Sequence, residues 1–357
     1  MAQNPTIRDV ARAAGVCAAT ASLALRNDSR LKKSTCEKVQ GIAEQLGYRT
    51  NAVVSQLLAQ LRTSRVPKYQ ATLGIINASE NPGIMDEVPT FREWRAGYRE
   101  RAFELGYGVD ELWLHEMGMS PHRLASILHA RNIHGVLVAA CLGNGELPSG
   151  FNEIWTDFAC VVIGVCNVRP LTHLACNDQY FTVWLAVEEA LRLGYSRPAL
   201  VINQDVDDLL NCRFSGAFLA AQNKLSAKQK VPPFYYRSPL DLPASNMASV
   251  ENKKRFNEWL KRHQPDVILC MHTEIKGWVE SSRPGDPSQV GLIHLDWSEQ
   301  LQGWAGVNQN SRLVGAAGVD LLVGLLHRNE LGIPSFPKSL MVESSWVAGD
   351  TVRLQEK

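Results

Sequence analysis

Short apolar segments alternate with longer stretches of helical periodicity through most of the chain, from residue 72 onward. The apolar runs are residues 73–76, 135–140, 160–164, 198–202, 267–270 and 290–293, and helical patterns cover 92–105 and 180–193. This alternation is typical of parallel βαβ units, in which a crossover helix follows each strand. The strands are too many for one small sheet, and 357 residues exceed the roughly 250 to 300 that one core accommodates. We therefore expect at least two domains, mostly α/β.

The composition is that of an ordinary folded protein. Hydrophobic residues make up 45% and charged residues 20% of the chain, which excludes collagen-like, low-complexity and wholly disordered chains. No apolar run approaches the roughly 18 to 20 residues that cross a bilayer, and the first residues lack a signal-peptide pattern. The eight scattered cysteines contain no C-x-x-C pair, so we expect reduced thiols, no metal site and no cofactor. The expected location is the cytoplasm, with no membrane partner.

Charge is distributed unevenly along the chain. Residues 1–65 hold 10 Lys and Arg against 4 Asp and Glu, whereas residues 66–357 hold 27 against 32. A basic head on a mildly acidic body predicts binding to a polyanion, because cationic side chains displace the counterions condensed on phosphates. Charge alone does not separate DNA from RNA or from a membrane surface.

The basic head reads as three short helices. Thr6 opens the first by a capping pattern and Gly15 ends it, and residues 17–25 are small and compatible with a second helix. Ser34, with Glu37 as its capping partner, predicts the start of a third helix. A helix pair around a turn this tight is the geometry that places a second helix in the major groove of DNA.

The second helix has the side chains that close approach to DNA requires. Ala18, Ala19 and Ala21 are small enough to let the backbone come near the duplex, and Thr20 and Ser22 offer hydroxyl groups to phosphates or bases. The alternative is structural, since small helical bundles are common in proteins that bind no DNA.

Two segments of the head, residues 6–16 with 19–22 and residues 46–51, resemble the DNA-binding head of the lactose-repressor (LacI/GalR) family. The resemblance implies a helix-turn-helix head over 1–49, a hinge helix and linker over 50–71, and an effector-binding and dimerisation body over 72–357. It implies double-stranded operator DNA as a partner. The DNA-binding residues that it implies are Thr6, Cys17, Ala18, Ala19, Thr20, Ser22, Arg26, Asn27, Tyr48, Asn51, Val54 and Leu57.

Three positions depart from the family pattern. Leu23 stands where the family usually has an arginine that reaches a guanine edge, so the resemblance does not carry over the operator sequence. Cys17 replaces the usual serine at the start of the recognition helix, and Thr50 replaces the common proline before Asn51. The framework that contacts phosphates does not require Leu23 to read a base, so DNA binding remains the expectation.

The segment 52–62 carries apolar positions at helical intervals. Isolated helices below roughly 12 to 15 residues are marginal in water, so we expect this one to order only when a dimer is on DNA. By resemblance, Leu57 wedges open a base step in the minor groove, which kinks the DNA.

The body resembles the effector-binding part of the same family, two open α/β lobes like those of periplasmic sugar-binding proteins. The resemblance assigns about 72–175 and 305–335 to one lobe, and about 176–304 and 336–352 to the other. In open parallel sheets a ligand binds beyond the carboxyl ends of the strands, so we expect the effector between the lobes.

Five residues are candidates for effector binding. Arg213 stands in an Arg-x-x-Gly pattern whose arginine reaches the effector in the family, and its planar fork suits vicinal hydroxyls or a carboxylate. Asp296 follows a predicted strand and can accept two sugar hydroxyls, and Trp297 offers a flat apolar face. Gln309 and Asn77 are weaker candidates near strand ends. The alternatives are a surface salt bridge for Arg213, helix capping for Asp296, core packing for Trp297 and turn chemistry for Asn77.

The sequence contains none of the common catalytic motifs in a suitable context, so we do not expect an enzyme. The predicted function is a ligand-responsive transcriptional regulator, a repressor, that binds an operator as a homodimer and takes a carbohydrate effector between its lobes. The alternative is a ligand-independent architectural DNA-binding protein. A cleft in which Arg213 and Asp296 face each other would separate the two.

Overall fold

The computed structural model describes residues 7–25, 31–46, 69–140, 147, 150–151, 154–164, 169–238, 250–282 and 290–355. The head contains three helices, α1 (Ile7–Ala14), α2 (Ala18–Ala24) and α3 (Lys33–Gln45). They pack around a small apolar core in which Val10, Ala21 and Val39 are fully buried. Gly15 directly follows α1 in the turn that leads to α2, and its φ of +70° is one that glycine adopts without strain.

The third helix starts differently from the sequence expectation. The residue that precedes it is Lys32, which makes no side-chain capping bond, and the helix begins at Lys33. Ser34 therefore lies inside the first turn, and the predicted capping pair of Ser34 with Glu37 does not mark the start. The backbone amides of Thr35 and Cys36 instead donate to the Lys32 carbonyl, so main-chain bonds alone begin this helix.

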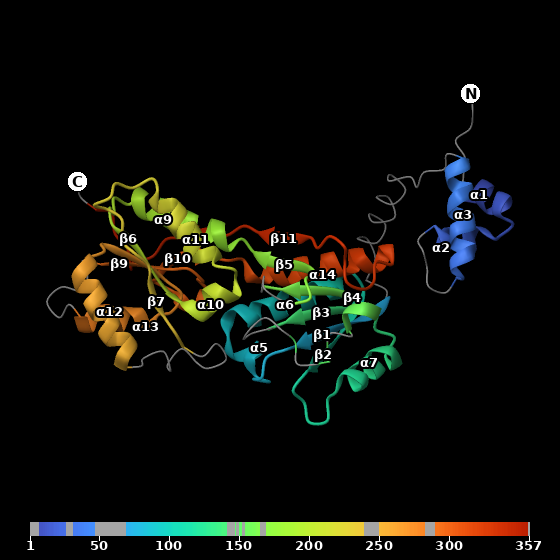
Figure 1. The fold of residues 1–357 in the computed structure, drawn as a ribbon, viewed down its shortest axis with the longest axis horizontal. Helices are drawn as coiled ribbons and strands as arrows, with labels where there is room; N and C mark the ends of the chain where they lie inside the picture. Colours follow the sequence, from blue (N-terminus) through green and yellow to red (C-terminus); the bar gives the residue numbers. More distant parts are fainter. Residues whose placement is uncertain are drawn as a thin grey trace.

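The first lobe of the body contains a sheet of six parallel strands in the order β11-β5-β4-β3-β1-β2 (Figure 1). The strands are β1 (Ala71–Asn77), β2 (Tyr107–Trp113), β3 (Gly135–Ala139), β4 (Ala159–Ile163), β5 (His173–Asn177) and β11 (Ser339–Val342). Its helices are α5 (Ile84–Glu87), α6 (Pro89–Glu104), α7 (Pro121–Ala130), α8 (Ile154–Asp157) and α14 (Ser311–Arg328). Helices α6 and α14 cover one face and α7 covers the other, so the central strands β1, β3, β4 and β5 are buried on both sides, whereas the edge strand β11 is exposed.

The second lobe repeats this plan with the order β12-β10-β9-β8-β6-β7, parallel except for β12. Its strands are β6 (Pro198–Asn203), β7 (Phe234–Tyr236), β8 (Val267–Cys270), β9 (Gly291–His294), β10 (Ala305–Asn308) and β12 (Ser345–Val347). Its helices are α9 (Gln179–Arg192), α10 (Gln204–Leu209), α11 (Arg213–Gln222), α12 (Val250–His263), α13 (Glu274–Ser282) and the 3-10 helix η4 (Glu299–Leu301). Helices α9 and α11 pack on one face, and α12 and α13 on the other. The predicted fold class, a helical head and a body of two parallel α/β lobes, is confirmed.

Two strands belong to the opposite lobe from the one expected. Strand β10, expected in the first lobe, pairs with β9 of the second, and β11, expected in the second lobe, pairs with β5 of the first. The chain thus crosses between the lobes after β5, after β10 and after β11. The reason is a hydrogen-bonding pattern that strand periodicity does not encode, because an apolar run of four residues fits either sheet equally well.

The crossing segments are tied together by a small buried network. Asn177 donates to Thr182 at 2.8 Å and to Ser344 at 3.2 Å, and the Thr182 and Ser344 hydroxyls are 2.7 Å apart. Asn310, on the remaining crossing, donates to the carbonyl of Glu343 at 2.8 Å. These bonds join the three crossings into one hinge.

Helices α6 and α14 approach each other closely where both carry glycine. A Cβ at Gly97 would lie 1.9 Å from the Arg312 carbonyl oxygen, and one at Gly315 would lie 2.2 Å from the Trp94 carbonyl oxygen. Neither backbone has room to retreat, so only glycine fits at this crossing. Among the described residues, no helix is long and apolar enough to cross a membrane.

Candidate functional site

The start of α2, the predicted recognition helix, is capped by a thiol. The backbone amide of Thr20 donates to the Cys17 sulfur at 3.4 Å, and the Thr20 hydroxyl lies 3.0 Å from the same atom. Cys17 thereby fills the capping place in which the family resemblance leads us to expect a serine. Cys17 is exposed and Thr20 is partly exposed, so both are open to a partner at this end of the helix.

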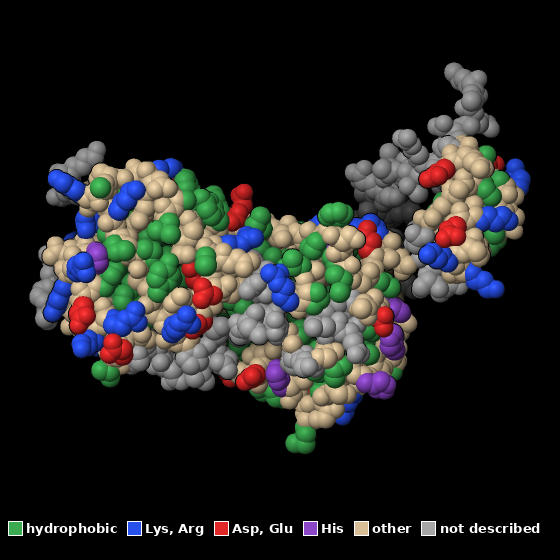
Figure 2. All heavy atoms as spheres, in the orientation of Figure 1, with side chains coloured by type: hydrophobic (Ala, Val, Ile, Leu, Met, Phe, Trp, Pro, Cys, Tyr) green, Lys and Arg blue, Asp and Glu red, His purple; other side chains and the backbone are tan. Residues whose placement is uncertain are grey.

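Exposed basic side chains surround the head helices, among them Arg12, Lys32, Lys33 and Lys38, and Figure 2 shows Lys and Arg side chains on this part of the surface. Ala18, Ala19 and Ser22 lie on α2 as predicted. The remaining predicted DNA contacts, Thr6, Arg26, Asn27, Tyr48, Asn51, Val54 and Leu57, lie outside the described residues, as does the predicted hinge helix. The DNA-contacting roles of all these residues stay predictions.

Asp296 links the two lobes. It follows β9 of the second lobe, and its carboxylate accepts a hydrogen bond from the hydroxyl of Thr90, at the start of α6 in the first lobe. Its backbone amide donates to the Nδ1 atom of His294 at 3.2 Å, so both the main chain and the side chain of Asp296 are held. Burial raises the pKa of this carboxyl group, and the bond from Thr90 opposes the rise.

Arg213 also reaches the first lobe. It is the first residue of α11 and follows Asn211 and Cys212, which both have a φ of 55°, a left-handed conformation that is uncommon outside glycine. Its Nη1 atom lies 3.2 Å from the sulfur of Met341, on the edge strand β11. Strained residues cluster at functional sites, where the surrounding structure holds them. Arg213 and Asp296 therefore both border the lobe junction, but no hydrogen bond or ion pair is described between them.

The other three candidates bind the chain itself. The Trp297 indole donates to the Leu301 carbonyl at 3.1 Å, and the buried Gln309 amide donates to the Leu295 carbonyl at 2.8 Å. Asn77 accepts from the Ser79 amide at 3.0 Å, and its Nδ2 atom lies 3.4 Å from two carbonyls of the following loop. These bonds support the structural alternatives for the three residues. Their part in effector binding stays a prediction.

Two histidines that sequence reasoning did not select lie beside Asp296. His272 follows β8 and His294 ends β9, so both stand at the carboxyl end of the second sheet. Burial lowers the pKa of both, that of His294 to about 4, and each histidine is therefore neutral near pH 7. The signal available in the sequence was their position directly after two neighbouring strands.

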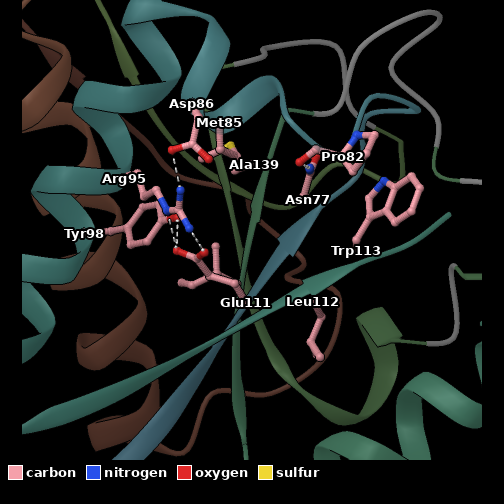
Figure 3. Close-up of a pocket in the computed structure, with 11 residues that line it drawn as sticks. Asn77, Pro82, Met85, Asp86, Arg95, Tyr98, Glu111, Leu112, Trp113 and Ala139 are labelled. Carbon is pink, nitrogen blue, oxygen red and sulfur yellow. Dashed lines mark hydrogen bonds and ion pairs between the residues drawn. The ribbon is translucent and has the colours of Figure 1, made fainter. Parts of the chain in front are cut away.

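A cavity of about 120 Å³ lies in the first lobe beside α5, and Asp296 is not among the residues that line it (Figure 3). Asn77, Pro82 and Trp113 line one side of it, and Arg95 and Glu111 line the other. The long loop after β1 forms its wall. All of its charged groups are paired, since Arg95 contacts both Asp86 at 2.7 Å and Glu111 at 2.6 Å, so these groups hold the loop and α6 to the sheet. Among the described residues, no cluster of His, Cys, Asp and Glu has the arrangement of a metal site.

Comparisons with known proteins agree with this architecture. Residues 6–51 match the family described as bacterial regulatory proteins, lacI family. The maltose regulon regulatory protein MalI of Escherichia coli (strain K12) is 25% identical over 311 residues, 84% of this chain and 82% of MalI.

Two solved structures share the fold over 98% of this chain at 17% identity. A complex of the transcriptional regulator CelR with cellobiose is covered over its whole length, with a TM-score of 0.56. The lac repressor dimer bound to operator and an anti-inducer is covered over 99%, with a TM-score of 0.54.

The family match of the head and the similarity to curated regulators identify the chain as a transcriptional regulator, not an enzyme. Its head matches the lacI family of bacterial regulatory proteins, and over most of its length the chain is similar to the regulatory protein MalI.

Proposed function

We propose that this regulator binds operator DNA as a homodimer, acts as a repressor, and changes its DNA affinity when a carbohydrate binds between the lobes. The observation that carries the proposal is that Arg213 and Asp296, both of the second lobe, contact first-lobe residues at the lobe junction. Any change in the angle between the lobes alters these two contacts. A ligand that engages the same side chains therefore biases that angle.

Known relatives support each part of the proposal separately. CelR is a transcriptional regulator whose solved structure is a complex with cellobiose, and the lac repressor was solved as a dimer bound to operator. MalI is named as a regulator of the maltose regulon. These properties belong to those proteins, and the shared fold makes them hypotheses for this chain.

The mechanism follows from the hinge. A ligand hydroxyl that replaces the Thr90 hydroxyl on Asp296, and a second group that replaces Met341 at Arg213, would stabilise one arrangement of the lobes over another. The segment 52–62, which precedes β1, would transmit this arrangement to the paired heads. Coupling between two sites of roughly 1 to 3 kcal/mol changes an affinity about 5- to 150-fold.

The alternative is a ligand-independent architectural DNA-binding protein. It is favoured by the bonds of Asn77 and Gln309 to the main chain, because side chains engaged in this way are not available to a ligand.

The test combines DNA binding with a ligand screen. An operator is selected from random duplexes with the full chain, and its affinity is then measured with and without each compound of a panel of sugars and nucleosides. We expect at least one compound to change the affinity. If none does while the chain still selects a defined sequence, the architectural alternative holds.

Variants then locate the effector site. Arg213→Ala and Asp296→Ala should each remove the effect of the compound and weaken its binding at least tenfold, without lowering DNA affinity in its absence. Arg192→Ala is the control, since Arg192 is an exposed, paired residue on α9 of the same lobe. Compound affinity within twofold of the unmodified chain in both variants would remove Arg213 and Asp296 from the site.

A further inference from the structure

Two buried polar atoms of the second lobe have no hydrogen-bond partner. They are the hydroxyl oxygen of Tyr236 and one carboxylate oxygen, Oε2, of Glu274, and no others of this kind are found in the described part of the chain. Buried polar side-chain atoms nearly always have a partner in folded proteins, so each exception calls for an explanation. One explanation is a partner from outside the chain. The place of these residues in the fold bears on that explanation.

Both residues stand at the edge of the second sheet that faces the first lobe. Tyr236 ends β7, and Glu274 opens α13 shortly after β8. Strands β6, β7, β8 and β9 are all parallel, so their carboxyl ends share one edge. That edge carries Asp296, whose carboxylate contacts Thr90 of the first lobe. Tyr236 and Glu274 therefore lie at the same sheet edge as Asp296 of the proposed effector site.

Packing keeps the Tyr236 hydroxyl in place. The side chain is 1% exposed, and its ring lies 5.8 Å from the ring of Trp278 and 6.2 Å from that of His272, both in edge-to-face geometry. A ring enclosed in this way cannot swing its hydroxyl to solvent. Burial raises the pKa of the phenol well above its ordinary value, so the group stays protonated and can still donate.

The charge around these atoms limits what they can bind. Glu274 is the charged side chain that acts on both Tyr236 and His272, and His272 is kept neutral by burial. A carboxylate with a free oxygen accepts hydrogen bonds and repels anions. A partner that satisfies both atoms must therefore donate a hydrogen to the Glu274 carboxylate, as a hydroxyl or an ammonium group does.

We propose that Tyr236 and Glu274 form a subsite of the inter-lobe effector site that binds a hydroxyl or ammonium group of the effector. The inference rests on the proposed function, because it assumes that a ligand enters between the lobes. It adds that the effector is a neutral polyol or an amine-bearing sugar, and that the end reaching this subsite carries no phosphate or carboxylate.

The first test needs no ligand. Thermal unfolding of the full chain is compared for Tyr236→Phe, Glu274→Gln and the control Tyr98→Phe. Tyr98 is equally buried, and its hydroxyl donates to Glu111 at 2.8 Å. Removing an unpaired group should leave the melting temperature of the first two variants unchanged or higher, while Tyr98→Phe lowers it. A fall in Tyr236→Phe as large as that in Tyr98→Phe would show that the hydroxyl is already satisfied, by water or by the chain, and would overturn the proposal.

The second test uses calorimetry with cellobiose, glucosamine and glucose 6-phosphate. We expect cellobiose or glucosamine to bind, and Glu274→Gln and Tyr236→Phe to weaken that binding at least tenfold. A larger loss in Glu274→Gln for glucosamine than for cellobiose identifies an ammonium contact. Binding of the phosphate alone overturns the subsite. So does a sugar that Asp296→Ala weakens but that both subsite variants bind within twofold of the unmodified chain, although the proposed function then stands. If none of the three binds, the unfolding comparison decides.

Discussion

The carboxylate of Glu111 accepts four hydrogen bonds, from the side chains of Arg95, Tyr98 and Arg99. Arg95 donates at 2.6 and 3.0 Å, Tyr98 at 2.8 Å and Arg99 at 2.9 Å. Burial by itself raises the pKa of Glu111, but these bonds outweigh burial and lower it to about 2. Because the folded pKa lies below the unfolded value of 4.5, the stabilisation is fully present above pH 4.5 and is lost as the pH falls toward 2.

Replacing Glu111 should therefore cost stability at neutral pH and little in acid. We expect Glu111→Gln to reduce the free energy of unfolding by on the order of 2 kcal/mol at pH 7, and by much less near pH 2.5. Urea unfolding at the two pH values measures the difference. Glu104→Gln is the control, since its ion pair with Arg101 is 61% exposed on the glutamate side and such pairs contribute little. An equal loss at both pH values would contradict the assignment.

The pKa of His294 is also lowered in the folded chain, but by burial, and its titration acts over a higher pH range. Burial lowers its folded pKa from 6.5 to about 4, so the unfolded chain binds the proton more readily. Stability should fall as the pH drops from 6.5 to 4 and change no further below that range on account of this group. His294→Asn keeps an acceptor for the Asp296 amide but does not titrate. Between pH 6.5 and 4, the free energy of unfolding of the variant should fall by up to about 3 kcal/mol less than that of the unmodified chain. An unchanged pH profile would mean that other groups cause the slope.

Among the elements, the crossing of α6 and α14 is the least tolerant contact. A side chain at Gly315 meets backbone atoms of Trp94 at 2.2 Å, whereas at Gly324, on the same helix, the nearest atom is the flexible end of Arg328 at 3.2 Å. Gly315→Ala should therefore destabilise the chain by roughly 1 to 3 kcal/mol or more. Gly324→Ala should be neutral or stabilise by up to about 1 kcal/mol, because alanine favours helix. Chemical denaturation of both variants checks the contrast, and similar effects at the two sites would rule out a tight crossing.

The first turn of α6 depends on the other lobe. No side chain of its own lobe caps this helix, and its Thr90 hydroxyl binds Asp296 from the second lobe. The free energies of unfolding of Thr90→Val, Asp296→Asn and the double variant form a cycle. We expect a coupling of roughly 0.5 to 3 kcal/mol between the two residues. Additive effects, within about 0.3 kcal/mol, would show that the contact contributes nothing.

The sequence predicted the elements well and their partners poorly. The six predicted apolar runs form β1, β3, β4, β6, β8 and β9, because burial on both faces requires long apolar runs. The three head helices lie close to their predicted ranges, whereas β2, β5, β7, β11 and β12 were not predicted. The lobe assignment of β10 and β11 was wrong, because the sequence of a short strand does not indicate which strand it pairs with. The same holds for the contact of Thr90 with Asp296, which are 206 positions apart.

The candidate site shows a similar division. Arg213 and Asp296 were selected by family resemblance, and the structure places both at the lobe junction. Tyr236 and Glu274 were not selected, because the property that distinguishes them is a missing hydrogen-bond partner. That property exists only once the surrounding side chains are in place, and no spacing along the chain reveals it.

On the scale of the whole molecule, DNA affinity should reside in residues 1–62. This part carries most of the excess positive charge and the helix pair, and the body has its own cores in both lobes. Deleting residues 1–62 should abolish duplex binding and leave cooperative unfolding of the body intact. Electrophoretic mobility shift and circular dichroism measure the two effects. A truncated chain that still shifts duplex DNA as strongly as the full one would place the DNA-binding surface elsewhere.

The three crossings between the lobes also set the order in which the protein can be completed during synthesis. The first lobe needs α14 to cover one face of its sheet and β11 to close one edge, and both follow the strands β6 to β10 of the second lobe in the chain. Until residue 328, the end of α14, has left the ribosome, Leu137 and Ile163 lack the helix that packs on them. The lobe that is translated first is therefore finished nearly last, and the sheet face that α14 covers stays exposed through most of synthesis, as an apolar surface of the kind that favours aggregation.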